Sequence, residues 1–153
     1  MRRCLLVLSF LLVAVTAPLA GQNQVTGIRD LDFGVVIRGV QTAIAPSDPI
    51  YSGRFYVNYR RNRDVQFQLI LPTSLARVGG GGTLAISFGP TDAIARGTSP
   101  PSQPVVFDPN VPQLFHLQTS TDFYINLGGR VSPTAVQPSG AYSGTIILTV
   151  VFL

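Results

Sequence analysis

The chain has 153 residues, of which 46% are hydrophobic and only 12% are charged. Its eleven basic residues are all Arg, its seven acidic residues are all Asp, and its formal net charge is +4. A charge this small gives no support for a nucleic acid or an anionic membrane surface as partner. Gly and Pro are plentiful, with 15 and 12 residues, while Lys and Glu are absent. The composition therefore favours β structure over helix.

The first twenty residues have the pattern of a secretory signal peptide. Arg2 and Arg3 precede an apolar run at 5–15, and small residues follow up to Ala20. A membrane anchor is the alternative, but the apolar run is shorter than the roughly 20 residues that a spanning helix needs. We expect cleavage and no membrane span after it.

Cleavage after Ala20 would leave one domain, residues 21–153. A cut after Ala17 fits the small-x-small rule better but would place Pro18 at the new terminus. The single cysteine, Cys4, would leave with the signal. The mature domain would then have no disulfide, no cysteine nucleophile and no cysteine-ligated metal. We expect a protein secreted to the periplasm, the cell surface or the medium.

The mature chain is predicted to form eight or nine short β-strands and no helix. Its N-terminal stretch, 21–27, is polar and predicted to be frayed. Alternating apolar runs bounded by turn residues predict strands at 28–37, 40–45, 51–59, 65–71, 83–88, 105–107, 114–117, 122–127 and 145–152. Turn signals recur every ~8–15 residues, as is typical of a sandwich. The sequence therefore predicts an all-β, immunoglobulin-like antiparallel β-sandwich.

Two of these strands form the clearest local prediction. Residues 51–59 and 65–71 flank the polar stretch 60–64 and are predicted to pair as a hairpin. The expected inward residues are Phe55, Val57, Tyr59, Val65, Phe67, Leu69 and Leu71. The proline-rich stretch 89–104 and the stretch 128–140 are predicted to be loops.

The last strand, 145–152, is apolar on both faces. One face carries Ile146, Leu148, Val150 and Phe152. The other carries Thr145, Ile147, Thr149 and Val151. A strand that is apolar on both faces belongs in the middle of a sandwich or against a partner.

Two short motifs resemble a known family. Leu31-Asp32-Phe33-Gly34 resembles the LDFG element of bacterial secreted β-sandwich proteins, namely the DUF4402 group and the related spore coat protein U and pilin-like domains. Gly128-Gly129, followed by PSGAYSGT at 138–145 and the alternating last strand, resembles their closing motif. The resemblance covers both ends of the chain, and the middle only in strand rhythm. It implies an exported, immunoglobulin-like structural or pilus-type surface subunit without catalysis.

The resemblance also implies partners. In pilins assembled by a chaperone and usher, the sandwich lacks its last strand, and a neighbour's N-terminal segment fills the groove. Like subunits or an export chaperone are therefore the expected partners. The candidate assembly strands carry Val25, Ile28, Leu31 and Phe33 at one end, and Ile146, Leu148, Val150 and Phe152 at the other. Val25 and Ile28 are unevenly spaced and the cysteine pair usual in such coat-type pilins is missing. A self-complete sandwich, closed by its own first strand, is the alternative.

No residue pattern indicates catalysis, and we expect no enzyme, cofactor or metal. His116 is the single histidine, and Asp30 and Asp32 form a D-x-D in strand-like sequence. The run Gly79–Gly82 lacks the Lys and Ser/Thr of a phosphate-binding loop. Each has an ordinary structural interpretation.

A second function from a different class is a monomeric extracellular module that binds a glycan or a protein. Its candidate residues lie on a Tyr/Arg face, with the long loop 89–104 as an alternative surface. They are Tyr51, Tyr56, Arg60, Arg61 and Arg63. The tyrosines would offer a stacking surface and the arginines a basic cluster, although half-buried sheet aromatics and a solvated turn explain the same residues.

Overall fold

The computed structural model describes residues 24–59, 62–97, 103–117 and 121–153. The described residues form thirteen β-strands and no helix. The strands are β1 (Gln24–Arg29), β2 (Thr42–Ile44), β3 (Gly53–Tyr59), β4 (Arg63–Ile70), β5 (Ser74–Arg77), β6 (Thr83–Ser87), β7 (Ala93–Gly97), β8 (Val105–Phe107), β9 (Gln113–Leu117), β10 (Thr121–Leu127), β11 (Gly129–Ser132), β12 (Tyr142–Ser143) and β13 (Ile147–Phe152). The predicted signal peptide lies outside the described residues.

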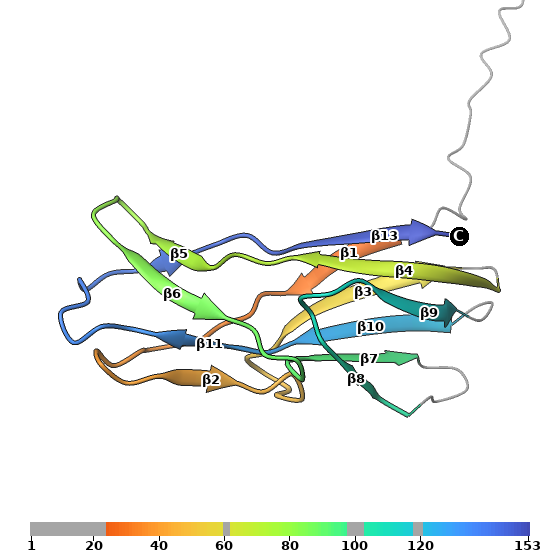
Figure 1. The fold of residues 1–153 in the computed structure, drawn as a ribbon, viewed down its shortest axis with the longest axis horizontal. Helices are drawn as coiled ribbons and strands as arrows, with labels where there is room; N and C mark the ends of the chain where they lie inside the picture. The colour runs from red at the N-terminus through yellow and green to blue at the C-terminus, as the bar shows by residue number, and fades with distance from the viewer. Residues whose placement is uncertain (1–23, 60–61, 98–102, 118–120) are drawn as a thin grey trace, which may run out of the picture.

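The strands form three antiparallel sheets in an elongated molecule (Figure 1). Sheet I has the order β1-β3-β10-β7-β8, sheet II the order β12-β5-β6-β11-β2, and sheet III the order β13-β4-β9. Sheets I and III pack face to face at one end of the long axis, and sheet II forms the other end. The predicted all-β antiparallel sandwich is confirmed, with thirteen strands in place of eight or nine.

The larger core lies between sheets I and III. Alternate residues of facing strands point into it because side chains on a strand alternate between its faces. Val57 of β3, Val65 of β4 and Ile125 of β10 are fully buried. The ring of Phe67 lies 5.4 Å from those of both Phe115 and Phe123, a spacing at which aromatic pairs attract. This aromatic cluster joins the two layers.

The smaller core lies on sheet II. Only Leu84, Ile86 and Val131 are buried in it. No described strand faces this sheet across the core. Instead, two irregular segments, 30–41 and 133–141, cover it.

The predicted hairpin is wrong. β3 pairs with β1 and β10 in sheet I, while β4 pairs with β13 and β9 in sheet III. The chain crosses from one layer to the other between them. Alternation shows that a strand has a buried face, but strands that pair and strands that face each other across a core have the same alternation. The predicted inward direction holds for Phe55, Val57, Val65 and Phe67.

The predicted strand 28–37 is also wrong beyond its start. β1 ends at Arg29 and no strand follows until Thr42. Asp32 ends the extended stretch, because its carboxylate accepts a hydrogen bond of 2.8 Å from the N–H of Gly34, which has a φ of 59°. An Asx turn that leads into a left-handed glycine turns the chain out of a strand.

The two stretches predicted to be loops each contain a strand. β7 lies within 89–104 and pairs with β10 and β8. Its sequence, AIARG, has few β-branched residues, but Ala93 and Ala95 are buried on the inner face of sheet I, opposite Leu127 and Ile125 of β10. β11 lies within 128–140, and Gly128, the residue before it, permits a close approach of the chain to Ile44. A Cβ atom on Gly128 would lie 2.3 Å from the carbonyl oxygen of Ile44.

Candidate functional site

The last strand has a partner on one side only. β13 pairs with β4 and forms the edge of sheet III, so it does not lie in the middle of a sheet. The N–H of Leu153 donates to the carbonyl of Asp64 at 3.0 Å. Hydrogen-bonded pairs alternate along an antiparallel ladder. The N–H groups of Leu148 and Val150 therefore point away from β4, toward a side where the described residues place no strand.

The interior of the sandwich is incompletely covered along this edge. Val25 of β1 lies opposite Val57 of β3 and so points to the same inner face. Val57 is fully buried, yet Val25 is 40% exposed. The inward residues of the last strand region are likewise only half-buried against the core: Ile146, Leu148, Val150 and Phe152. The sandwich is open between β1 and β13.

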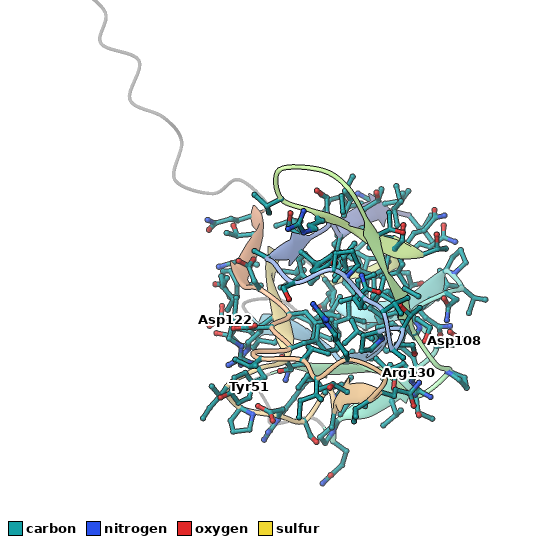
Figure 2. All side chains as sticks on the ribbon, turned by 90° about the vertical axis from the view of Figure 1, so that its left-hand side faces the viewer. Tyr51, Asp108, Asp122 and Arg130 are labelled. Carbon is teal, nitrogen blue, oxygen red and sulfur yellow. The ribbon has the colours of Figure 1, made fainter. Side chains whose placement is uncertain are left out.

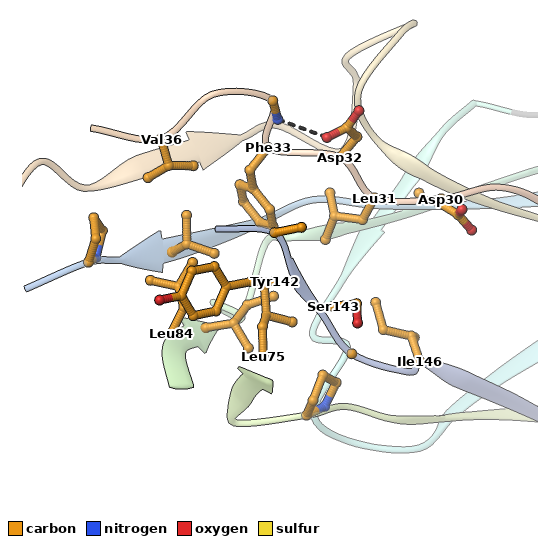
Figure 3. Close-up of a pocket in the computed structure, with 18 of the residues that line it drawn as sticks. Asp30, Leu31, Asp32, Phe33, Val36, Leu75, Leu84, Tyr142, Ser143 and Ile146 are labelled. Carbon is orange, nitrogen blue, oxygen red and sulfur yellow. Dashed lines mark hydrogen bonds between the residues drawn. The ribbon is translucent and has the colours of Figure 1, made fainter. Parts of the chain in front are cut away.

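Beside this opening, next to Ile146, lies a cavity of about 880 Å³, which we call the groove (Figure 3). One wall is the segment 30–38, the other is the segment 138–146, and the floor is the small core of sheet II. Apolar lining comes from Leu31, Phe33, Val36, Leu75, Leu84 and Tyr142. Charged residues stand along one wall: Arg29, Asp30, Asp32 and Arg38.

Polar side chains hold the second wall in place. Gln137 is buried, and its amide donates to the carbonyl of Thr83 at 2.9 Å and to the hydroxyl of Tyr142 at 2.7 Å. The Tyr142 hydroxyl donates in turn to the carbonyl of Pro138 at 2.7 Å. These bonds attach the segment 133–142 to β6. The groove is therefore bounded by a fixed wall.

The first wall is attached to the rest of the molecule in the same way. The N–H of Asp32 donates to the carbonyl of Tyr51 at 3.0 Å. Arg38 donates from its guanidinium to the hydroxyl of Ser139, which lies on the opposite wall. This contact closes one end of the groove across its two walls.

The two sequence motifs meet at the groove. The segment 31–34 lies on one wall and the segment 138–145 on the other. The predicted assembly residues gather there as well: Leu31, Phe33 and Ile146 line the groove, Leu148, Val150 and Phe152 form the inner face of β13, and Val25 and Ile28 lie on β1. Sequence reasoning selected these residues but gave no sign that the groove between them is open.

The described residues of the predicted Tyr/Arg face lie on different sheets and loops. Tyr51 and Asp122 lie on one side of the molecule, away from Asp108 (Figure 2). Tyr56 lies on the outer face of sheet I, and its hydroxyl donates to the Asp122 carboxylate at 2.7 Å, which raises the pKa of Tyr56. Arg63 lies on β4 in sheet III and donates to the carbonyl of Leu153. Arg60 and Arg61 lie outside the described residues.

The remaining sequence candidates have structural roles. Nδ1 of His116 lies 2.7 Å from Oδ1 of Asp64, its cross-strand neighbour, and both side chains are exposed. Asp30 is exposed, and Asp32 holds its turn. Among the described residues, no group of three or more His, Cys, Asp or Glu side chains is placed to hold a metal ion. A helix long and apolar enough to cross a membrane is also absent from that part of the chain.

Comparison with known proteins adds no relative. No family model, no curated protein and no solved structure matches the chain. The resemblance to the DUF4402 and spore coat protein U group stays a prediction from two short motifs, whose residues form the two walls of the groove.

Proposed function

We propose that this protein is a non-catalytic, exported structural subunit of a surface assembly. In that assembly, the open edge of β13 and the groove receive an extended strand from a second copy of the chain. The observation that carries the proposal is an apolar groove whose lining ends at Ile146, directly before β13, a strand at the edge of its sheet. The resemblance to pilin-like and coat proteins and the predicted signal peptide support it.

The chemistry of the site selects an extended strand as the occupant. On its open side, β13 presents backbone N–H groups at Leu148 and Val150, with a carbonyl group between them. Only another strand can bind such a row repeatedly. Its alternate side chains would enter the space between the layers and cover Val25, which now points inward yet is exposed. Strand addition of this kind draws affinity from the main chain and specificity from side-chain pockets.

The outer face of β13 supports a partner as well. Proteins protect free strand edges with charged residues, prolines or bulges. β13, with the sequence ILTVVF, has no charge and no proline, and its register with β4 is continuous. Ile147 and Val151 are 49% and 45% exposed. An edge left unprotected in this way is suited to pairing.

A second copy carries a suitable strand at its N-terminus. The segment 24–33 contains Val25, Ile28, Leu31 and Phe33. β1 pairs only with β3, at the edge of sheet I, and borders the groove without pairing with β13. Exchange of an edge strand between identical chains requires few new contacts. Before assembly, an export chaperone would cover the same groove.

Light scattering tests the proposal. The protein, produced from the full chain, is measured over a wide range of concentrations, with and without a synthetic peptide of residues 21–37. We expect ordered oligomers that grow with concentration, and chain ends that the peptide caps. A monomer that persists at every concentration and ignores the peptide would contradict the proposal.

A matched pair of variants locates the interface. Val151→Lys places a charge on the open edge of β13 and is expected to shift assembly to about tenfold higher concentration. Val106→Lys makes the same change at a valine of similar exposure on β8, the edge of sheet I. An equal effect of both variants would assign the association to general hydrophobicity rather than to β13.

The alternative function is a monomeric binding module for a glycan or a protein. Of the residues predicted for it, Tyr56 and Arg63 lie in different sheets, and Arg60 and Arg61 lie outside the described residues. A separate set of residues on the outer face of sheet I supports a binding site.

A further inference from the structure

The outer face of sheet I contains a second cavity, of about 460 Å³, which we call the arginine pocket. Arg29 is the one lining residue that it shares with the groove. Three guanidinium groups line it, together with a tyrosine, an asparagine and an isoleucine: Arg29, Arg54, Arg96, Tyr124, Asn126 and Ile94. No acidic residue is among its lining residues. Its volume lies in the ~300–1,000 Å³ range of small-molecule sites.

Strand register brings these residues together. Arg54 of β3 lies opposite Arg29 of β1 on one side and opposite Asn126 of β10 on the other. Tyr124, two residues before Asn126, lies opposite Arg96 of β7. Residues directly opposite in a ladder point to the same face of the sheet. Four strands therefore contribute to one outward-facing cluster.

The positive charge of the cluster is poorly neutralised. Like charges on opposed positions of neighbouring strands repel each other. Arg29 donates to the carbonyls of Pro49 and Ser52 and to the hydroxyl of Ser52, and it lies near enough to Asp48 to help lower the pKa of that carboxyl. Within the described part of the chain, neither Arg54 nor Arg96 forms an ion pair with a carboxylate. An anion bound among the three would relieve the repulsion.

Two buried atoms in the pocket have no hydrogen-bond partner among the described residues. They are Nε of Arg54, a donor, and Oδ1 of Asn126, an acceptor. The Arg54 guanidinium is held over the ring of Tyr124, with Cζ 4.1 Å from the ring centroid. Buried polar groups without partners cost free energy, so their presence indicates a missing partner. A ligand for this pocket must offer both an acceptor and a donor.

We infer that the arginine pocket binds the carboxylate of an acidic sugar, such as a uronic acid unit of a polysaccharide. A carboxylate matches the planar guanidinium fork. A hydroxyl on a neighbouring carbon supplies the hydrogen that Asn126 Oδ1 accepts, which sulfate and acetate lack. Ile94 provides apolar contact for a ring face. Apart from Arg29, its residues do not line the groove, so an assembled subunit would still display Arg54, Arg96 and Asn126.

Calorimetric titration of the protein with trigalacturonic acid tests the inference. We expect saturable binding that weakens by about tenfold or more when the methyl ester replaces the acid. Arg96 is exposed, and Arg96→Gln is expected to weaken binding by about tenfold. Arg63→Gln, on sheet III, removes the same charge elsewhere and is expected to leave affinity unchanged.

A second variant separates binding from folding. Asn126→Asp is nearly isosteric and places a carboxylate opposite Arg54. This carboxylate would pair with the guanidinium groups in place of the ligand's carboxylate. We expect binding to be lost while the melting temperature stays the same or rises. No binding by the wild-type protein, equal binding of the ester, equal competition by acetate or sulfate, or equal weakening by Arg63→Gln would each overturn the inference.

Discussion

The two ends of the molecule bury their apolar residues in different ways. Where sheets I and III face each other, ten hydrophobic residues are buried and aromatic rings interlock; on sheet II only three are buried. Both ends consist of similar short strands. The difference is the cover: a second sheet at one end, two irregular segments at the other. A sheet facing a sheet excludes water from alternating side chains on both sides, which irregular segments do less completely.

The difference in packing between the two ends also suggests different roles for them: one end for stability and the other for binding. The aromatic end has the close packing of a protein interior, and we expect it to determine the overall stability. The sheet II end leaves a groove of about 880 Å³ beside its core. Sites that bind a partner lie preferentially in regions of lower local stability. The groove therefore lies in the part of the fold where apolar side chains remain partly exposed to solvent.

Two valines provide the sharpest test of this comparison. Val57 and Val131 are both completely buried, each with 0% exposure to solvent. Val57 lies in the aromatic core, whereas Val131 lies beside the groove. Val57→Ala is expected to lower the free energy of unfolding by about 2–3 kcal/mol, because it removes two buried methyl groups and leaves a cavity. Val131→Ala is expected to cost about 1–2 kcal/mol, since the groove already adjoins the site.

Urea denaturation of both variants measures the difference. Equal losses would mean that the groove wall packs as tightly as the aromatic core, and the proposed division between the two ends would fail.

Removing the hydrogen bonds that hold the groove wall gives a smaller effect. Gln137→Ala removes the hydrogen bonds that the Gln137 amide donates to the carbonyl of Thr83 and to the hydroxyl of Tyr142. We expect a loss of about 1–2 kcal/mol, the cost of a buried hydrogen-bonded group. Hydrogen exchange should accelerate at the N–H of Val78, which donates to Ala141 in this wall.

Gln41→Ala is the matched control, because the exposed Gln41 amide bonds only to the Ser132 hydroxyl. Its effect should stay below about 0.5 kcal/mol. Unchanged exchange at Val78 in Gln137→Ala would show that the wall does not depend on this network.

The smallest effect is expected at the junction of the two ends, in the turn between β2 and β3. The Asp48 carboxylate accepts hydrogen bonds from the N–H groups of Tyr51 and Ile50, which lower its pKa below the ordinary value of 3.8. A depressed carboxyl pKa adds stability above the unfolded-state value, and this stability is lost as the pH falls through the folded-state pKa. Acid titration of stability below pH ~4 should therefore be shallower in Asp48→Asn than in the wild type. Identical profiles would contradict this role.

Sequence alternation was sufficient to predict the fold class and the buried faces. Phe55, Val57, Val65 and Phe67 point inward as their spacing predicts. It could not distinguish pairing within a sheet from packing between sheets, which explains the wrong hairpin. It also missed β7, whose small residues have weak strand propensity but fit against β10.

The sites were less accessible to sequence reasoning. The groove walls come from 31–38 and 138–146, which are far apart in the chain. Sequence alternation could not show that β13 lies at the edge of its sheet. The arginine pocket depends on register alone. Alternation already indicated that Arg54 and Tyr56 share an outer face, but only the ladders place Arg29 and Arg96 beside them.

The passage at Gly128 has a mechanical consequence. β10 ends at Leu127 and β11 begins at Gly129, so this one residue carries a nearly continuous strand from sheet I into sheet II along the long axis (Figure 1). A Cβ atom at Gly128 would collide with the carbonyl of Ile44, and its N–H is held by the carbonyl of Asp92 at 2.7 Å. Ladder hydrogen bonds run perpendicular to the strands. Tension along the molecule would thus load many of them at once, and the protein would resist stretching as a tether rather than unravel from one end.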